Sequence, residues 1–99
     1  MLEGCRDYGF KDQIQRAAVS IMNNIAEGSE SGSEALFIKF LRISKGSCAE
    51  VRSMLYVSLD LGYITKEKFD SLMEDSLKIS RSLNRLIQTL KTPSESQTK

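Results

Sequence analysis

Two short rows of basic side chains carry the most specific chemistry in this chain. They comprise Lys39, Arg42 and Lys45 in one row and Lys78, Arg81 and Arg85 in the other. Residues three or four positions apart lie on one side of an α-helix, so each row can present a line of positive charge to nucleic-acid phosphates. The alternative is a solvated helix face, because the whole chain has 14 basic and 13 acidic residues and a net charge of +1. If the rows bind RNA or DNA, the predicted contacts are Lys39, Arg42, Lys45, Arg81 and Arg85.

The sequence contains few residues that could support catalysis. The chain contains no histidine, the commonest general base at neutral pH, and neither of its two cysteines, Cys5 and Cys48, has a neighbour that would lower the thiol pKa. The spacing of the cysteines matches no metal site. Gly28 and Gly32 lack the lysine of a phosphate-binding loop. We therefore expect no enzymatic activity, no metal, no cofactor, and free thiols at both cysteines.

Glu50 is a charged residue in an otherwise apolar pattern. It lies seven residues from both Ile43 and Val57, along a stripe of small and apolar residues. A charge among such neighbours needs a partner. The structural interpretation is a pair with a side chain such as Arg16 or Asn24, and the functional one is a recognition contact with another molecule.

Four small residues, Gly46-Ser47-Cys48-Ala49, occupy the middle of the same segment. Glycine inside a helix costs about 1 kcal/mol relative to alanine, so something should benefit from the missing side chain. We predict that another helix packs closely against these four small residues. A hinge or a notch for a ligand is the alternative.

Three amphipathic helices must position these residues. Apolar side chains recur at intervals of three and four in three segments of the chain. The expected helices cover approximately residues 10–27, 33–61 and 65–91. They form one domain over residues 1–91, and the polar composition of residues 92–99 predicts a disordered tail.

The ends of these helices carry recognisable signals. Gly28 is expected to end the first helix, whereas Ser33 and Thr65 are the expected N-caps of the second and third. Leu61 and Gly62 begin a connection of only a few residues. A connection this short predicts that the second and third helices pack antiparallel.

The chain is expected to be soluble and cytoplasmic, with no membrane partner. Residues 1–10 lack the apolar stretch of a secretory signal. No apolar run approaches the roughly 20 residues that cross a bilayer.

The expected second helix has two apolar stripes, so it needs burial on two sides. Three helices of this length cannot cover all of that surface by themselves. Leaving three or four leucine-sized groups exposed would cost about 1.5 to 3 kcal/mol each. We therefore predict association, as a homo-oligomer or with a helical protein partner.

Six separated motifs resemble one protein family. They are DQIQRAAVSI at 12–21, NIAEG at 24–28, FIKFL at 37–41, GS at 46–47, AE at 49–50 and LGY at 61–63. Their order and spacing resemble the bacterial four-helix-bundle family first described from open reading frames in intervening sequences of 23S rRNA genes, sometimes labelled ribosomal proteins. The resemblance covers about residues 8–90. Its motif residues include Asn24, Glu27, Gly28, Gly46, Ser47 and Glu50.

The resemblance implies a bundle that assembles into a ring-shaped homopentamer. A relative, the accessory variability determinant of diversity-generating retroelements, binds nucleic acid and a reverse transcriptase through a basic surface. No member of the family suggests an enzyme. The resemblance thus favours RNA or DNA as a partner of this chain as well.

This sequence departs from the family pattern in three places. Members usually begin with a further helix before the segment that matches Tyr8, and here only residues 1–7 stand in its place. Met22 replaces a usual proline, and the loop Glu30-Ser31-Gly32 lacks the basic charge that relatives often carry. We therefore expect an all-α, antiparallel bundle of three long helices without the family's first helix. Another subunit or partner helices would cover the groove that remains.

Two functions follow from these observations. The first is a non-enzymatic, oligomeric accessory factor associated with RNA or DNA. The second is a protein-interaction or scaffold module with no affinity for nucleic acid. A small-molecule pocket within a ring is a third and more remote possibility.

Overall fold

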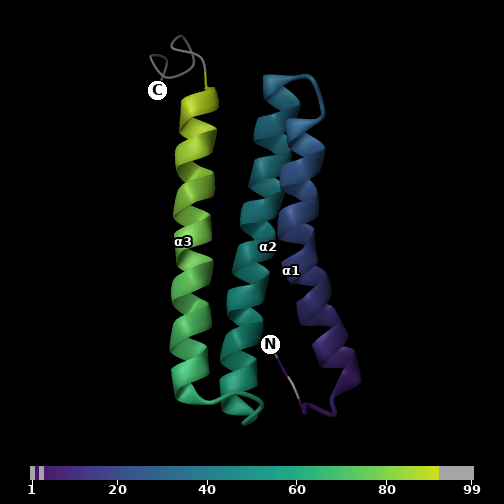
Figure 1. Cartoon of the computed structure of the whole chain (residues 1–99), viewed down its shortest axis with the longest axis vertical. Coiled ribbons are helices and arrows are strands. Elements are labelled where there is room, and N and C mark those ends of the chain that lie inside the picture. Colours follow the sequence, from purple (N-terminus) through teal and green to yellow (C-terminus); the bar gives the residue numbers. More distant parts are fainter. Residues whose placement is uncertain (1, 3, 92–99) are drawn as a thin grey trace.

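The computed structural model describes residue 2 and residues 4–91. This part of the chain contains three α-helices and no strand: α1 (Tyr8–Ser29), α2 (Glu34–Asp60) and α3 (Lys66–Leu90) (Figure 1). α1 begins two residues earlier and ends two residues later than the expected 10–27. The other two helices end within one residue of the expected positions. The expected tail at 92–99 lies outside the described residues.

Each helix begins with a side chain that accepts a hydrogen bond from a free backbone N–H group. Ser33 accepts from Leu36 at 3.3 Å, and Thr65 accepts from Lys68 at 3.1 Å, which confirms both predicted N-caps. Asp7, which was not predicted, caps α1. These bonds fix the starts of the helices, because the first turn of a helix has no internal partners for its N–H groups.

α2 is the central helix of the bundle. It packs against both α1 and α3, whereas no Cα atom of α1 lies within 8 Å of a Cα atom of α3. α3 returns antiparallel to α2 through the short connection that contains Gly62, where φ is +76° (Figure 1). α2 thus lies between α1 and α3 (Figure 1).

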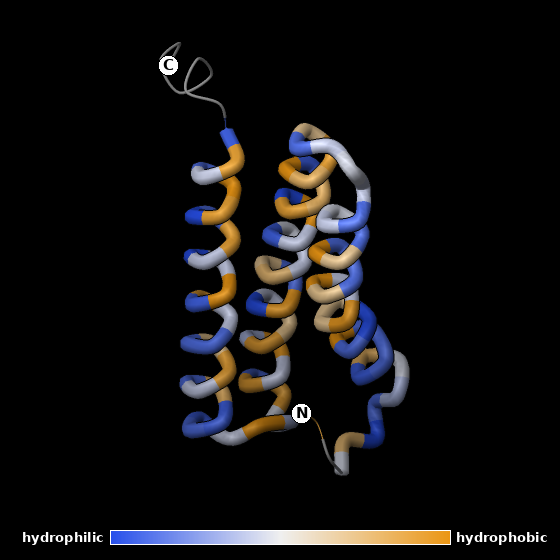
Figure 2. Tube along the Cα trace, turned by 45° about the horizontal axis from the view of Figure 1, so that its top comes forward, coloured by the Kyte–Doolittle hydropathy of each residue, from blue (hydrophilic) through white to orange (hydrophobic). Residues whose placement is uncertain are grey.

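The core lies on the inner sides of all three helices, and the apolar side of α3 faces the other two (Figure 2). Its buried apolar residues are Leu2, Ile14, Ala17, Ile21, Leu41, Cys48, Val51, Met54, Leu55, Phe69, Leu83 and Ile87. Serines also lie in this core, and each has a hydrogen-bond partner. Ser44 Oγ donates to the Ile21 carbonyl at 2.8 Å, which ties α2 to α1.

The close approach of α1 to α2 occurs at Gly28 and not at Gly46. A Cβ atom on Gly28 would lie 2.7 Å from Phe37 Cδ1 and 3.0 Å from Phe40 Cβ, so only glycine fits there without movement. A Cβ atom on Gly46 would meet nothing within 4 Å, so the prediction of close packing at Gly46 is wrong. The expected stop at Gly28 is also wrong, because α1 continues through it, and the positive φ of +75° that favours glycine occurs at Gly32.

An apolar groove runs between α1 and α3, above α2. It is about 250 Å³ in volume, and its lining residues are Ala18, Ile21, Met22, Val51, Leu72, Asp75, Ser76 and Ile79. Met22 is 69% exposed and Ile79 is 40% exposed. The groove lies where no Cα atom of α1 comes within 8 Å of a Cα atom of α3, and it leaves the apolar sides of both helices partly in contact with water.

The cysteines, the hydropathy of the helices and the possible metal ligands were predicted from the sequence and can be compared with the structure. Cys5 and Cys48 are free thiols, as expected, and burial raises the pKa of the Cys48 thiol. None of the three helices is long and apolar enough to span a bilayer. In residue 2 and residues 4–91, no group of three or more potential ligands could hold a metal ion.

Candidate nucleic-acid interface

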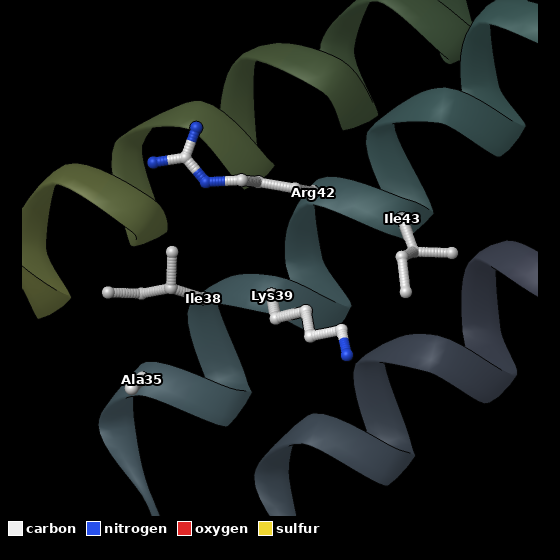
Figure 3. Close-up of a pocket in the computed structure, with 5 residues that line it drawn as sticks. All are labelled: Ala35, Ile38, Lys39, Arg42 and Ile43. Atoms are coloured by element: carbon white, nitrogen blue, oxygen red, sulfur yellow. The ribbon is translucent and has the colours of Figure 1, made fainter.

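Three basic residues of α2 lie on the side of that helix that faces α3. Arg42, Lys45 and Arg52 are separated by three and seven residues, which places them on one line along the helix. We call these three residues the basic stripe. Lys45 and Arg52 reach α3 through hydrogen bonds, and the Arg42 side chain extends toward α3 (Figure 3). The antiparallel α2–α3 pair therefore positions the stripe along its outer seam.

Lys45 and Arg42 form the upper part of the basic stripe. Lys45 Nζ donates to Asn84 Oδ1 at 2.6 Å, so a neutral amide holds the ammonium group in place. Arg42 borders a shallow surface hollow of about 440 Å³ that Ile38 and Ile43 also line (Figure 3). Both side chains keep their positive charge at the surface, in contact with water.

Arg52 forms the lower part of the basic stripe and is partly buried. Its Nη1 atom donates to Ser76 Oγ at 3.1 Å and to Ser80 Oγ at 3.0 Å. A guanidinium group has five N–H donors, so these two bonds leave donors available on the other nitrogen atoms. The sequence analysis did not single out Arg52. Its spacing of seven residues from Lys45 is the signal that could have identified it.

No carboxylate neutralises the basic stripe within the described part of the chain. The ion pairs found there join Arg16 to Asp12, Lys66 to Asp70 and Arg81 to Glu74. All three pairs lie outside the stripe. Serine hydroxyls and an amide, which are neutral, bind Lys45 and Arg52 instead, so no acidic side chain of residue 2 or residues 4–91 compensates the positive charge of the stripe.

The five predicted nucleic-acid contacts do not form a single cluster. Lys39 extends toward the α1 side of α2, away from Arg42 (Figure 3). Arg81 pairs with Glu74 at 3.3 Å, and both side chains are more than half exposed. Arg85 is exposed on α3. Among the five, Arg42 and Lys45 share the side of α2 that faces α3.

Positive charge is concentrated at one end of the α2–α3 pair. Residues 34–47 and residues 76–91 lie at the same end, because α2 begins where α3 finishes (Figure 1). Their charged residues are Glu34, Lys39, Arg42, Lys45, Lys78, Arg81, Arg85 and Lys91, of which only Glu34 is acidic. The net charge of +1 for the whole chain conceals this separation.

The family-motif residues have mainly structural positions. Asn24 donates to the Ser20 carbonyl at 2.8 Å and to Ser20 Oγ at 3.0 Å. Ser47 Oγ donates to the same Ser20 Oγ at 3.0 Å, so the predicted close contact with another helix is confirmed at Ser47. Gly28 of α1 is buried against α2, whereas Glu27 and Gly46 are exposed.

Glu50 does not form the predicted internal pair. It is exposed on α2, and in the described residues no hydrogen bond or ion pair joins it to either proposed partner. Arg16 instead binds Asp12 at 2.8 Å, and Asn24 binds Ser20. The prediction fails because the α2 stripe that contains Glu50 lies beside α1 without being covered by it.

Comparisons with known proteins agree on one family. The family model described as "23S rRNA-intervening sequence protein" matches residues 1–85. A crystal structure from Bacteroides thetaiotaomicron, described as a protein with unknown function from the S23 ribosomal protein family, has a TM-score of 0.77 and 33% sequence identity. The match covers 80% of this chain and 70% of that one. A comparison with curated proteins gives no significant match.

Proposed function

Because the chain belongs to the 23S rRNA-intervening sequence protein family, we propose that it is a non-enzymatic, oligomeric accessory factor that binds RNA or DNA. The observation that carries this proposal is the basic stripe of Arg42, Lys45 and Arg52, whose charge has no acidic partner among the described residues. Nucleic-acid phosphates supply regularly spaced negative charge of the kind that such a stripe attracts.

The surroundings of the stripe support the same function. Seven of the eight charged residues in 34–47 and 76–91 are basic, and one of the seven, Arg81, is paired with Glu74. This excess of basic residues makes the local field positive although the chain is nearly neutral. Each phosphate contact releases a condensed counterion, which makes binding favourable at low salt and progressively weaker at high salt.

Assembly would multiply this surface, and we propose a homo-oligomer, a pentamer by resemblance to the family. Exposed apolar residues support assembly: Leu36, Ile43 and Val57 lie on one stripe of α2, at intervals of seven and fourteen residues with Glu50 between the last two, and are each about 42–43% exposed. The α1–α3 groove is a second surface of this kind. In a four-helix-bundle arrangement, a helix from another subunit or from a partner would occupy the fourth corner beside α1 and α3.

The test is the affinity for labelled RNA and DNA oligonucleotides between about 50 mM and 200 mM salt. The double variant Arg42→Ala/Lys45→Ala should lower the affinity and reduce the slope of log K against log salt by about 2. The control, Lys11→Ala/Lys68→Ala, removes the same charge away from the stripe and should change the slope less. Absence of salt-dependent binding by the unmodified protein at low ionic strength would exclude this function.

A protein-interaction or scaffold module is the second candidate. The exposed residues Leu36, Ile43, Val57 and Leu61 favour it, because apolar side chains at this spacing form a seam for a second helix. This function predicts self-assembly and binding of a partner helix, with no affinity for nucleic acid at any salt concentration.

A further inference from the structure

The α2–α3 seam contains an exposed aromatic ring as well as basic side chains. Tyr56 lies four residues beyond Arg52 and is 55% exposed. The sequence of intervals from Arg42 through Lys45 and Arg52 to Tyr56 is three, seven and four residues, so Tyr56 continues the line of the basic stripe. Arg42 and Tyr56 are 14 residues apart, which corresponds to about 21 Å along the helix.

The ring of Tyr56 packs against an aromatic ring of α3. It makes an edge-to-face contact with Phe69, with ring centroids 5.0 Å apart and an interplanar angle of 64°. Phe69 is itself buried and lies beneath Lys66, whose Nζ atom is 5.3 Å from the ring centroid. Tyr56 thus presents a positioned aromatic surface to solvent at one end of a line of positive charge.

Arg52 lies between the aromatic ring and the upper part of the stripe. The Ser76 and Ser80 hydroxyls fix its Nη1 atom, and no carboxylate in the described residues competes for its remaining donors. Arginine with free donors in a fixed plane binds phosphate oxygen atoms in pairs. An anionic chain on this seam would therefore meet Arg52 immediately before it reaches Tyr56.

An aromatic platform beside a line of positive charge suits unpaired bases. The bases of a duplex are stacked inside it and cannot stack on a protein side chain, whereas those of a single strand can. The three residues of the basic stripe also follow one line, which matches the backbone of one strand.

We propose that the α2–α3 seam binds single-stranded nucleic acid, with its phosphates on Arg42, Lys45 and Arg52 and one base stacked on Tyr56. This inference rests on the proposed nucleic-acid function and specifies the form of the ligand. It also assigns Tyr56 a role in binding that the basic residues alone would not require.

The experiment compares three probes by fluorescence anisotropy at low salt: a labelled 12-nucleotide oligo-dT, an oligo-U of the same length, and a labelled 12-base-pair DNA duplex. At least one single-stranded probe should bind more tightly than the duplex. Tyr56→Leu should weaken single-strand binding about tenfold, because base stacking on one aromatic side chain accounts for a loss of this size. Leucine keeps an apolar contact with Phe69, so the bundle should remain folded, as far-ultraviolet circular dichroism would verify. Tyr56→Phe should retain binding.

The control is Tyr8→Leu, which removes another exposed aromatic ring, 70% exposed, from α1. It should leave the affinity for all three probes unchanged. Equal or tighter binding of the duplex, or unchanged single-strand affinity in Tyr56→Leu, would overturn the inference and leave the proposed nucleic-acid function intact. Failure of the unmodified protein to bind any probe at low salt would overturn both.

Discussion

Lys45 Nζ donates a 2.6 Å hydrogen bond to Asn84 Oδ1, and this bond joins α2 to the C-terminal half of α3. The two residues are 39 positions apart in the sequence. The amide orients the ammonium group without neutralising it. A carboxylate in the same place would form a salt bridge and remove the charge from the seam. Replacing the side-chain amide of Asn84 by a carboxylate tests this difference.

Asn84→Asp should weaken nucleic-acid binding without removing any basic side chain. The new carboxylate lies beside Lys45, so one less phosphate is bound and the slope of log K against log salt should fall by about 1. Stability should change by less than about 1 kcal/mol, because exposed ion pairs contribute little. The control is Asn23→Asp, which makes the same charge change at an exposed position of α1. Equal losses in the two variants would show that net charge, and not the stripe, governs binding.

Gly28→Ala should destabilise the protein by about 1 to 3 kcal/mol, because the added methyl group overpacks the α1–α2 contact. The new Cβ atom would lie 2.7 Å from Phe37 Cδ1 and 3.3 Å from the Phe37 Cα atom. Urea unfolding followed by circular dichroism measures the effect.

Gly46→Ala is the matched control for that change. It adds the same atom to a helix where nothing lies within 4 Å, so only helix propensity changes, and stability should rise by about 0.5 to 1 kcal/mol. A stabilised Gly28→Ala variant would contradict the close packing of α1 on α2.

The start of α1 should respond to pH through Asp7 and Tyr63. The Tyr63 hydroxyl donates to Asp7 Oδ2 at 2.8 Å, and this bond, with a second from the Phe10 N–H group, lowers the pKa of Asp7 below 3.8. The same bond raises the pKa of Tyr63 above 10.0. At pH values above its ordinary pKa, the ionised Asp7 carboxylate therefore stabilises the folded protein. This stabilisation is lost as the pH falls through the lowered pKa of Asp7. Tyr63 contributes stability below pH 10.0 that is lost as pH rises through its raised pKa.

Tyr63→Phe removes this bond and tests both effects. The stability difference between the unmodified protein and this variant should be largest near neutral pH, should narrow as pH falls through the lowered pKa of Asp7, and should narrow again as pH rises through the raised pKa of Tyr63. Urea midpoints across this range measure it. Tyr8→Phe, which removes a hydroxyl from an exposed residue, should show no such dependence. A difference that stays constant between pH 7 and the acid limit would contradict the role of the Asp7–Tyr63 bond.

Ile79→Asp should reduce self-assembly, because Ile79 lines the α1–α3 groove that we expect a further helix to cover. Leu77→Asp places the same charge two residues away on α3, at a side chain of similar exposure that does not line the groove. Analytical ultracentrifugation should show a lower mass for Ile79→Asp than for Leu77→Asp at the same protein concentration. Equal masses would show that the groove is not part of the assembly interface.

The family and the helices could be derived from the sequence because both depend on local pattern. The recurrence of apolar residues every three or four positions predicts a helix wherever it occurs. Ser33 and Thr65 cap their helices through backbone groups three residues away, so their role needs no information about the rest of the fold. The motifs likewise follow the chain in order and spacing, and the family match confirms them.

The candidate site could be derived only in part. The spacing of Arg42 and Lys45 placed both on one side of a helix, and in the structure both side chains lie on the side of α2 that faces α3. The same reasoning grouped them with Lys39, which extends toward the other side of α2. Arg52 and Tyr56 were missed, because their importance comes from contacts with Ser76 and Phe69, residues that are distant in sequence.

The sequence by itself determined three amphipathic helices, two of their caps, the antiparallel return of α3 and the family, because each depends on residues close together in the chain. Only the tertiary structure decided which faces of those helices meet. It placed the close contact at Gly28 and left Gly46 in open space, because packing depends on which neighbour lies opposite a residue. It also separated α1 from α3 and left the basic stripe without a carboxylate among the described residues, because both features depend on the directions of three helix axes in space.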